Sequence, residues 1–164
     1  MNSDTLHRIT TRYEAHEDRV RLSGEKEDGR TVRLWLTQRL CLRLLPPLLH
    51  WLETQAGDLP AAEAWQGLSQ QAARAALSPG EPVQDDSADH WLVDAVDVTT
   101  QAAGVKLRLR CGEQVCGELT LAATPLRQWL GILHDQWRRA EWPASAWPAW
   151  FTPTAVPEGT AWLH

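Results

Sequence analysis

The sequence contains few cysteines and no long apolar run. Three Cys occur among 164 residues, and the densest apolar stretch, 40–52, is interrupted by Arg43, Pro46, Pro47 and His50. Since a membrane-spanning helix needs about 20 consecutive apolar residues, this pattern excludes one. The N-terminus is polar and lacks the apolar segment of an export signal. We therefore expect a cytoplasmic protein without membrane contact or a disulfide framework.

Catalytic motifs are also missing. The nucleophile elbow GxSxG, the phosphate-binding Walker loop, the dinucleotide-binding GxGxxG and the zinc-binding HExxH do not occur. The sequence therefore favours a non-catalytic protein without a cofactor or catalytic residue, and it leaves an enzyme open because a missing motif does not exclude one.

An acidic segment in the middle of the chain contains residue types that can bind a metal ion, but not in the pattern of a known metal-binding loop. Its members are Asp85, Asp86, Asp89 and His90. Hard oxygen ligands suit divalent cations, but the glycine turn and closing Glu of a calcium-binding loop are absent. We interpret the segment as a solvated acidic linker and predict no metal site.

Two of the cysteines flank a tight turn. Cys111 and Cys116 are expected to lie opposite each other, within the separation that a disulfide could bridge. Without further Cys or His nearby they do not make a zinc signature. We expect two reduced thiols with no ligand role.

Arginine and tryptophan dominate the basic and aromatic residues. Fourteen Arg stand against two Lys, and ten Trp against one Phe and one Tyr. Together with the many Ala residues, this bias favours a bacterial protein from a GC-rich genome. The net charge of −5 is uneven, because residues 54–104 carry one Lys/Arg and eight Asp/Glu, whereas residues 105–139 carry six and three.

The apolar pattern repeats faintly at an offset of 85 residues. Segment 11–52 can be laid on 96–137 without a gap so that apolar positions coincide. The clearest matches are Val20 with Val105, Leu22 with Leu107, Leu34 with Leu119, Leu45 with Leu130 and Leu48 with Leu133. Because such self-similarity is the signature of a repeated structural unit, we interpret the chain as an internal duplication.

The first unit, residues 8–53, predicts three strands and a helix. Apolar and polar residues alternate over the expected strands 8–14, 19–25 and 30–36. Thr37 is expected to cap a helix that begins at Gln38. Each proline of Pro46-Pro47 removes a helical hydrogen bond, so we expect a kink there or two short helices.

The connector, residues 54–90, predicts one amphipathic helix at 61–77 and an exposed acidic loop at 78–89. The apolar stripe of the helix, expected to face the core, is Trp65, Leu68, Ala72 and Ala76. The residues expected to face away are Glu63, Gln66, Gln70 and Arg74.

The second unit, residues 91–139, repeats the order of the first. Its expected strands are 91–99, 105–111 and 115–122. Thr124 is expected to cap a helix with Pro125 in its first position, which is the favoured place for Pro. The tail, residues 140–164, holds four Pro and five aromatic rings, and we expect it to lie extended across the body with its rings in surface grooves.

These elements predict an α+β fold in one domain, residues 1–164. It consists of two pseudo-repeated β-β-β-α units with antiparallel sheets, one connector helix and an extended Trp/Pro-rich C-terminal tail. A helix after each set of three strands argues against a parallel, doubly wound sheet.

The outward faces of the predicted strands supply the candidate binding residues. If the apolar residues point inward, alternation sends the basic ones outward together. These residues are Arg21, Arg33, Trp35, Lys106, Arg108 and Arg110. A basic sheet face with an aromatic ring can hold single-stranded nucleic acid. The competing interpretation is a solvated face whose arginines pair with glutamates across the strands.

Binding, not catalysis, is the function that the sequence favours. The Leu-rich helix at 40–52 and the Trp-rich tail are typical of contact surfaces. We predict a non-catalytic cytoplasmic bacterial protein that binds another macromolecule, with a protein partner or a second copy favoured. Single-stranded nucleic-acid binding through the basic sheet face is the alternative.

Overall fold

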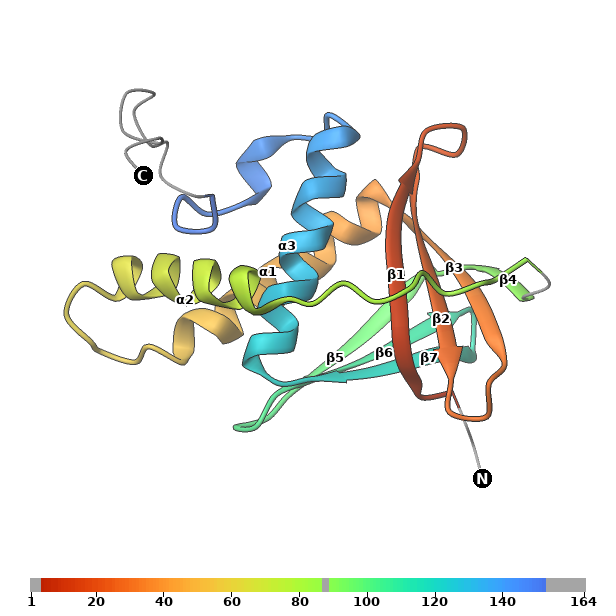
Figure 1. Ribbon diagram of the computed structural model, residues 1–164, viewed down its shortest axis with the longest axis horizontal. Helices are drawn as coiled ribbons and strands as arrows, with labels where there is room; N and C mark the ends of the chain where they lie inside the picture. Colours follow the sequence, from red (N-terminus) through yellow and green to blue (C-terminus); the bar gives the residue numbers. More distant parts are fainter. Residues whose placement is uncertain (1–3, 87–88, 153–164) are drawn as a thin grey trace.

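The computed structural model describes residues 4–86 and 89–152, and over these residues it has two sheets and three α-helices (Figure 1). The first sheet contains β1 (Leu6–Glu14), β2 (Arg19–Lys26), β3 (Thr31–Thr37) and β4 (Asp89–Leu92). The second contains β5 (Ala95–Thr100), β6 (Val105–Cys111) and β7 (Gln114–Leu121). The helices are α1 (Gln38–Thr54), α2 (Ala62–Ala76) and α3 (Ala123–Arg139). The predicted α+β class is confirmed.

Alternation sets the buried face of each sheet. Val20 pairs with Leu36 and Leu22 with Leu34 across β2 and β3, and all four side chains are fully buried. The neighbouring residues of opposite parity point to the other face of the sheet. Both sheets are antiparallel except where β4 joins β3 in a parallel pair.

The single strand predicted at 91–99 is wrong, because the chain changes sheets within it. The Val93 amide donates to the carbonyl of Trp35 in the first sheet, at 3.0 Å. The next amide, that of Asp94, donates to the carbonyl of Arg110 in the second sheet, also at 3.0 Å. The inward-facing positions change phase at this point, from Trp91 and Val93 to Val96 and Val98, and the prediction of one strand overlooked this shift.

Helix α1 runs without a break through Pro46 and Pro47, so the alternative of two short helices is wrong. Its start is as predicted, since the Leu40 amide donates to the Thr37 hydroxyl at 3.2 Å. The two prolines lie on the exposed side of the helix, as do Leu42 and Arg43 one turn earlier. The carbonyls that lose a helical donor can therefore bond water.

Helix α3 begins one residue before the predicted cap. Its N-cap is Ala122, which makes no side-chain capping bond, and Thr124 already lies inside the helix. Pro125 is therefore the third helical residue and not the first. It is tolerated because the first N–H groups of a helix have no intrahelical acceptor.

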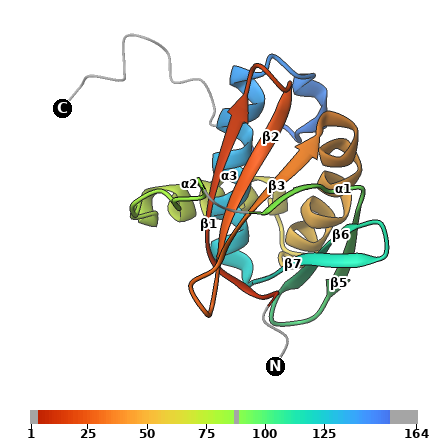
Figure 2. The ribbon, with the colours of Figure 1, turned by 90° about the vertical axis from the view of Figure 1, so that its right-hand side faces the viewer.

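Each long helix contacts the sheet of the other unit (Figure 2). From α3, the Trp129 indole donates to the Thr11 hydroxyl at 3.0 Å, and Gln136 Oε1 accepts the Tyr13 amide at 2.9 Å. From α1, the Trp51 indole donates to the carbonyl of Gln101 beyond β5, at 2.9 Å. The buried faces of both sheets and both helices thus share one core.

Helix α2 projects from the body, and its predicted sides are wrong in part (Figures 1 and 2). Glu63 and Arg74 are exposed as predicted. Gln66 and Gln70, expected to face away, are buried, whereas Trp65 is 38% exposed and Leu68 66% exposed. The buried amides bond backbone of neighbouring helices. Gln66 Nε2 donates to the carbonyl of Leu52 at 2.7 Å, and Gln70 Nε2 to that of Arg127 at 2.8 Å.

The loop predicted as exposed and acidic packs instead along the first sheet. The Val83 amide donates to the Thr10 hydroxyl at 2.9 Å, and Arg8 donates to the carbonyl of Glu81 at 2.7 Å. Asp85 is buried, so the solvated linker is wrong at this residue. The remaining acidic candidates, Asp86, Asp89 and His90, are exposed as predicted.

The tail is not extended over the part that the structure describes. Residues 140–152 turn back at Glu141 and contain a short 3-10 helix, Ala144–Ala146. Their rings pack with the end of α3 in an aromatic cluster, which comprises His134, Trp137, Trp142, Trp147, Trp150 and Phe151. The predicted burial of the rings is therefore correct for this part. The rest of the predicted tail, including Trp162, lies outside the described residues.

Candidate functional site

The structure divides the candidate basic residues between two sheets. Arg21, Arg33 and Trp35 lie on β2 and β3 of the first sheet. Lys106, Arg108 and Arg110 all lie on β6 of the second. Trp35 is half-buried.

Every cation among these candidates has a carboxylate partner. Arg21 lies 3.2 Å from Glu14, and Arg110 lies 3.2 Å from Asp97. On β7, Glu118 accepts from Arg108 at 2.8 Å and lies 3.6 Å from Lys106. This is the cross-strand pairing that the sequence offered as the competing interpretation.

Among these cations, Arg33 has the most buried carboxylate partner. That partner is Asp85, which was interpreted from the sequence as part of a solvated linker. The Arg33 Nε and Nη2 donate to the two carboxylate oxygens of Asp85 at 3.0 and 2.8 Å, and the Ser23 hydroxyl donates to the same carboxylate. The Asp85 and Arg33 side chains are only 7% and 17% exposed. Hydrogen bonds from Arg33, and then from Ser23, hold the pKa of Asp85 at about 2. The acidic segment therefore covers part of the basic face.

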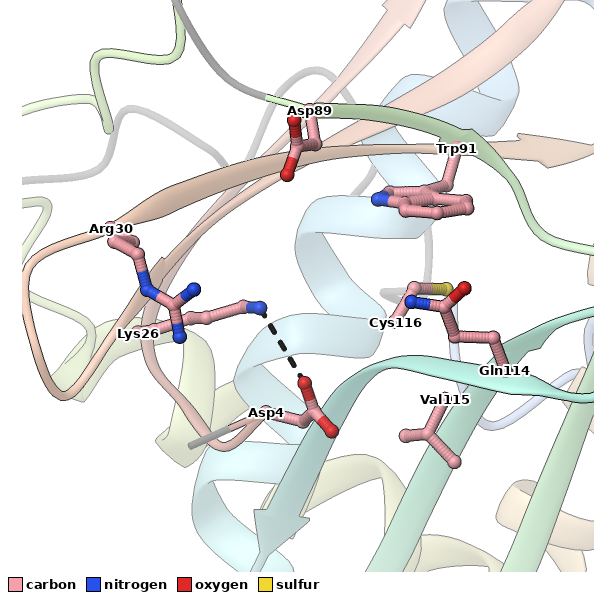
Figure 3. Close-up of a pocket in the computed structure, with 8 residues that line it drawn as sticks. All are labelled: Asp4, Lys26, Arg30, Asp89, Trp91, Gln114, Val115 and Cys116. Carbon is pink, nitrogen blue, oxygen red and sulfur yellow. Dashed lines mark hydrogen bonds and ion pairs between the residues drawn. The ribbon is translucent and has the colours of Figure 1, made fainter. Parts of the chain in front are cut away.

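A cavity of about 570 Å³ opens where the hairpin between β2 and β3 approaches β4 and β7 (Figure 3). Lys26 and Arg30 face it from the hairpin, and the Lys26 ammonium lies 3.5 Å from Asp4. The remaining lining residues are Asp89, Trp91, Gln114, Val115 and Cys116. Its two cations and two carboxylates balance, so the cavity has no excess charge to select an ionic ligand.

The thiol of this cavity is not an activated nucleophile. Burial raises the pKa of Cys116, and its Sγ donates to the carbonyl of Leu109 at 3.3 Å. A catalytic thiol needs the reverse, a lowered pKa. No group of three or more His, Cys, Asp or Glu that could hold a metal occurs within residues 4–86 and 89–152. The cavity therefore offers no catalytic constellation.

The sulfur atoms of Cys111 and Cys116 lie 2.7 Å apart, so their predicted proximity is correct. They are not directly opposite each other, because the strand register pairs Cys111 with Gln114 and shifts beside Cys116. We expect diamide, a two-electron oxidant, to join them in a disulfide. The two thiols lose two protons and two electrons, and diamide takes up both as its N=N bond is reduced to a hydrazine. Burial raises the pKa of both thiols, so the thiolate fraction is small at pH 7 and oxidation should accelerate as the pH is raised towards 9. The loss of two hydrogens in intact-mass spectra measures the reaction.

Cys116→Ser is the control for this oxidation and should show no loss of two hydrogens. A rate that does not change between pH 7 and pH 9 would contradict the role given to thiol burial.

The largest difference between the predicted and the observed surface is the outer face of α2, which was expected to be buried. It comprises Ala61, Trp65, Leu68, Ser69, Ala72 and Ala76, none of which is charged. Beside it, a cavity of about 710 Å³ lies between α2 and the aromatic cluster, lined by Gly67, Leu68, Gln71 and Trp150 among others. The sequence identified the same stripe but placed it in the core, since periodicity shows which residues share a face and not what covers them.

No helix in the described part of the chain is long and apolar enough to cross a membrane. Comparison with protein-family models, curated proteins and solved structures finds no match. Exposure, charge and contacts of the residues themselves are therefore what point to a function.

Proposed function

We propose that this chain is a non-catalytic cytoplasmic bacterial protein that binds another protein through the outer face of α2. The observation that carries the proposal is the exposure of Trp65 and Leu68, at 38% and 66%, on a helix that buries Gln66 and Gln70 instead. A helix normally turns its apolar stripe to the core. An uncharged apolar stripe turned to solvent is typical of a docking surface.

A second copy of this chain is the occupant that fits this face best. If two α2 helices pair antiparallel about a two-fold axis between Leu68 and Ser69, Trp65 of one copy meets Ala72 of the other. Ala61 likewise meets Ala76. Large residues then face small ones, and no charged residue is buried. Such self-complementarity is what an isologous dimer interface requires.

The expected dimer is weak. Helix α2 has 15 residues and is therefore about 22 Å long, which limits the area that one helix pair can bury. Interfaces below about 1,200 Å² belong to transient complexes. We expect a dissociation constant on the order of micromolar, to be measured by sedimentation equilibrium over a wide range of concentration.

Leu68→Glu is expected to weaken the dimer at least thirtyfold, about 2 kcal/mol, because it brings two carboxylates to the two-fold axis and removes apolar contact. Leu92→Glu is the matched control, since Leu92 is an exposed leucine on β4, far from α2 in sequence and on another element. The control should dimerise like the unmodified protein. A protein that remains monomeric at all concentrations would overturn the proposed docking surface.

Disulfide cross-linking tests the antiparallel register of the two α2 helices in the proposed dimer. Ala61→Cys in one copy and Ala76→Cys in the other should form a mixed covalent dimer on oxidation. Either variant alone should not, because its two introduced thiols lie at opposite ends of the pair, about 20 Å apart. Efficient cross-linking of Ala61→Cys to itself would contradict this register.

We also infer that the two β-β-β-α units arose by duplication. Helices α1 and α3 coincide end to end at the offset of 85 residues seen in the apolar pattern. Trp51 and Gln136 occupy matching positions, and each bonds backbone of the other unit, at Gln101 just after β5 and at Tyr13 within β1. This shared arrangement supports a pseudo-two-fold relation between the units.

Single-stranded nucleic-acid binding through the basic sheet face has less support. Arg33 is covered by Asp85, and the cations of the second sheet are paired with Glu118 and Asp97. Fluorescence anisotropy with a mixed-sequence oligonucleotide at low salt tests it. Salt-sensitive binding that Arg108→Ala weakens would favour this alternative over the protein partner.

A further inference from the structure

The guanidinium of Arg127 is buried without a counter-ion in the described structure. Arg127 is 3% exposed, and no carboxylate of residues 4–86 or 89–152 lies within 4.0 Å of it. The neighbouring acidic residue Asp135 pairs with Arg74 instead. Because an arginine does not lose its charge in a protein, burial without an anion is costly.

The contacts that Arg127 does make compensate this charge only partly. Its Nη2 donates to Gln66 Oε1 at 2.6 Å. The rings of Trp65 and Trp150 lie 5.6 and 5.7 Å from the guanidinium carbon, within the range of a cation–π contact. Nη1 is buried and has no hydrogen-bond partner among the described residues. At least part of the donor capacity of the guanidinium is thus unused.

Arg127 lines a cavity of about 420 Å³ that also contains the first turn of α3. Ala123 and Thr124 lie on its wall, and the cap residue Ala122 makes no side-chain bond to their end of the helix. The uncapped N–H groups of a helix N-terminus favour negative charge. Arg127 and the positive end of α3 therefore line the same cavity.

The remaining lining indicates which anion fits. Trp65, Ala72, Ala73 and Ala76 form apolar walls, and Ser69 and Gln55 add two polar groups. Arg127 is the only charged residue of the lining, so one negative charge balances the site and a second would be buried without a partner.

We infer that this cavity is a binding site for a small organic monocarboxylate. The carboxylate lies against Arg127 and the first turn of α3, and its apolar body lies against Trp65 and the alanines of α2. The volume is in the range of small-molecule sites. The unpaired guanidinium supplies affinity, and the small apolar walls limit the size of the ligand.

Thermal unfolding with acetate, butyrate, benzoate and inorganic phosphate, at ionic strength matched with chloride, tests the site. A ligand that binds the native state alone raises the midpoint temperature as its concentration rises. We expect butyrate or benzoate to raise it more than acetate, and phosphate to raise it no more than chloride does. Isothermal titration then gives the dissociation constants.

Arg127→Met should remove the carboxylate-dependent rise, with a dissociation constant at least tenfold weaker. Ser69→Leu, which narrows the cavity and leaves Arg127 in place, should also abolish binding and remains informative if Arg127→Met fails to fold. Arg108→Met, an exposed arginine of β6, is the control for general attraction of anions and should bind like the unmodified protein.

Three results would overturn the site. Equal stabilisation by phosphate would contradict the monocarboxylate class, and an undiminished response in Ser69→Leu would place the binding elsewhere. The test includes Glu158→Gln, because Glu158 is the side-chain carboxylate of the chain outside the described residues. If neither the unmodified protein nor this variant responds to any carboxylate, the site is excluded. The titration is repeated on Leu68→Glu, so that the outcome does not depend on the proposed dimer.

Discussion

Asp85→Asn is expected to lower the free energy of unfolding by about 2 kcal/mol at pH 7. The substitution removes the carboxylate that accepts from Arg33 and Ser23, and it leaves a guanidinium that is 17% exposed without its anion. Breaking one partner of a largely buried ion pair costs more than the pair contributes as a whole, because the remaining charge stays desolvated. Urea unfolding followed by far-ultraviolet circular dichroism measures the difference.

The pH dependence of this difference follows from the pKa of Asp85. The folded-state pKa, about 2, lies below the ordinary value of 3.8, so the folded protein holds the ionised form. The stabilisation is therefore complete above about pH 4 and is lost as the pH falls through about 2. We expect the stability curves of the unmodified protein and Asp85→Asn to converge over this window.

Asp86→Asn is the matched control, because Asp86 is exposed and adjacent in the sequence. It should change the free energy of unfolding by less than about 0.5 kcal/mol. If Asp85→Asn behaved like this control at pH 7, the acidic segment would not be anchored on the first sheet.

Trp137→Ala is expected to destabilise the fold by about 3 to 5 kcal/mol, the usual cost of removing a fully buried tryptophan. Its side chain is 1% exposed, lies edge-on to Trp142 and Trp147, and donates to the carbonyl of Pro143 at 2.9 Å. The substitution thus opens a cavity and removes the residue that holds residues 140–152 against α3. The same unfolding measurement gives its size.

Trp65→Ala serves as the comparison, since Trp65 is 38% exposed. Its cost should be lower, about 2 kcal/mol, because a partly exposed ring buries less apolar area, and the cation–π contact with Arg127 is the other interaction lost. Trp137→Phe should fall between the two, as it retains most of the ring volume and loses the hydrogen bond to Pro143. Equal costs at positions 137 and 65 would contradict the structural role of the aromatic cluster.

Local patterns in the sequence were sufficient for β1, β2, β3, β6 and β7 and for the positions of the helices, but not for the division into β4 and β5. Val20, Leu22, Leu34 and Leu36 alternate with polar residues, and a period of two has only one geometric interpretation once one face is buried. The cap of α1 at Thr37 was equally predictable, because it depends on an amide only three residues away. The proximity of Cys111 and Cys116 was predicted, but their strand register was not.

Such local patterns could not predict hydrogen-bonding partners that lie far apart in the sequence. Asp85 bonds residues 62 and 52 positions earlier in the chain, and nothing near it in the sequence signals that bond. Arg127 and Gln66, which are 61 positions apart, were both overlooked as buried polar residues for the same reason. A signal did exist at α2, since half of its apolar stripe, Ala72 and Ala76, is alanine, which buries little area and makes a weak core face.

The sequence by itself determined the α+β class, the buried faces of β2, β3 and β6, and the apolar stripe of α2. Those properties depend on periods of two and of 3.6 residues and on neighbours a few positions apart. Only the tertiary structure decided that Trp65 and Leu68 face solvent, that Asp85 covers Arg33 and that Arg127 is buried beside a cavity. Each of these depends on whether a distant segment supplies a hydrogen-bonding partner, and that is decided when the sheets and helices pack together.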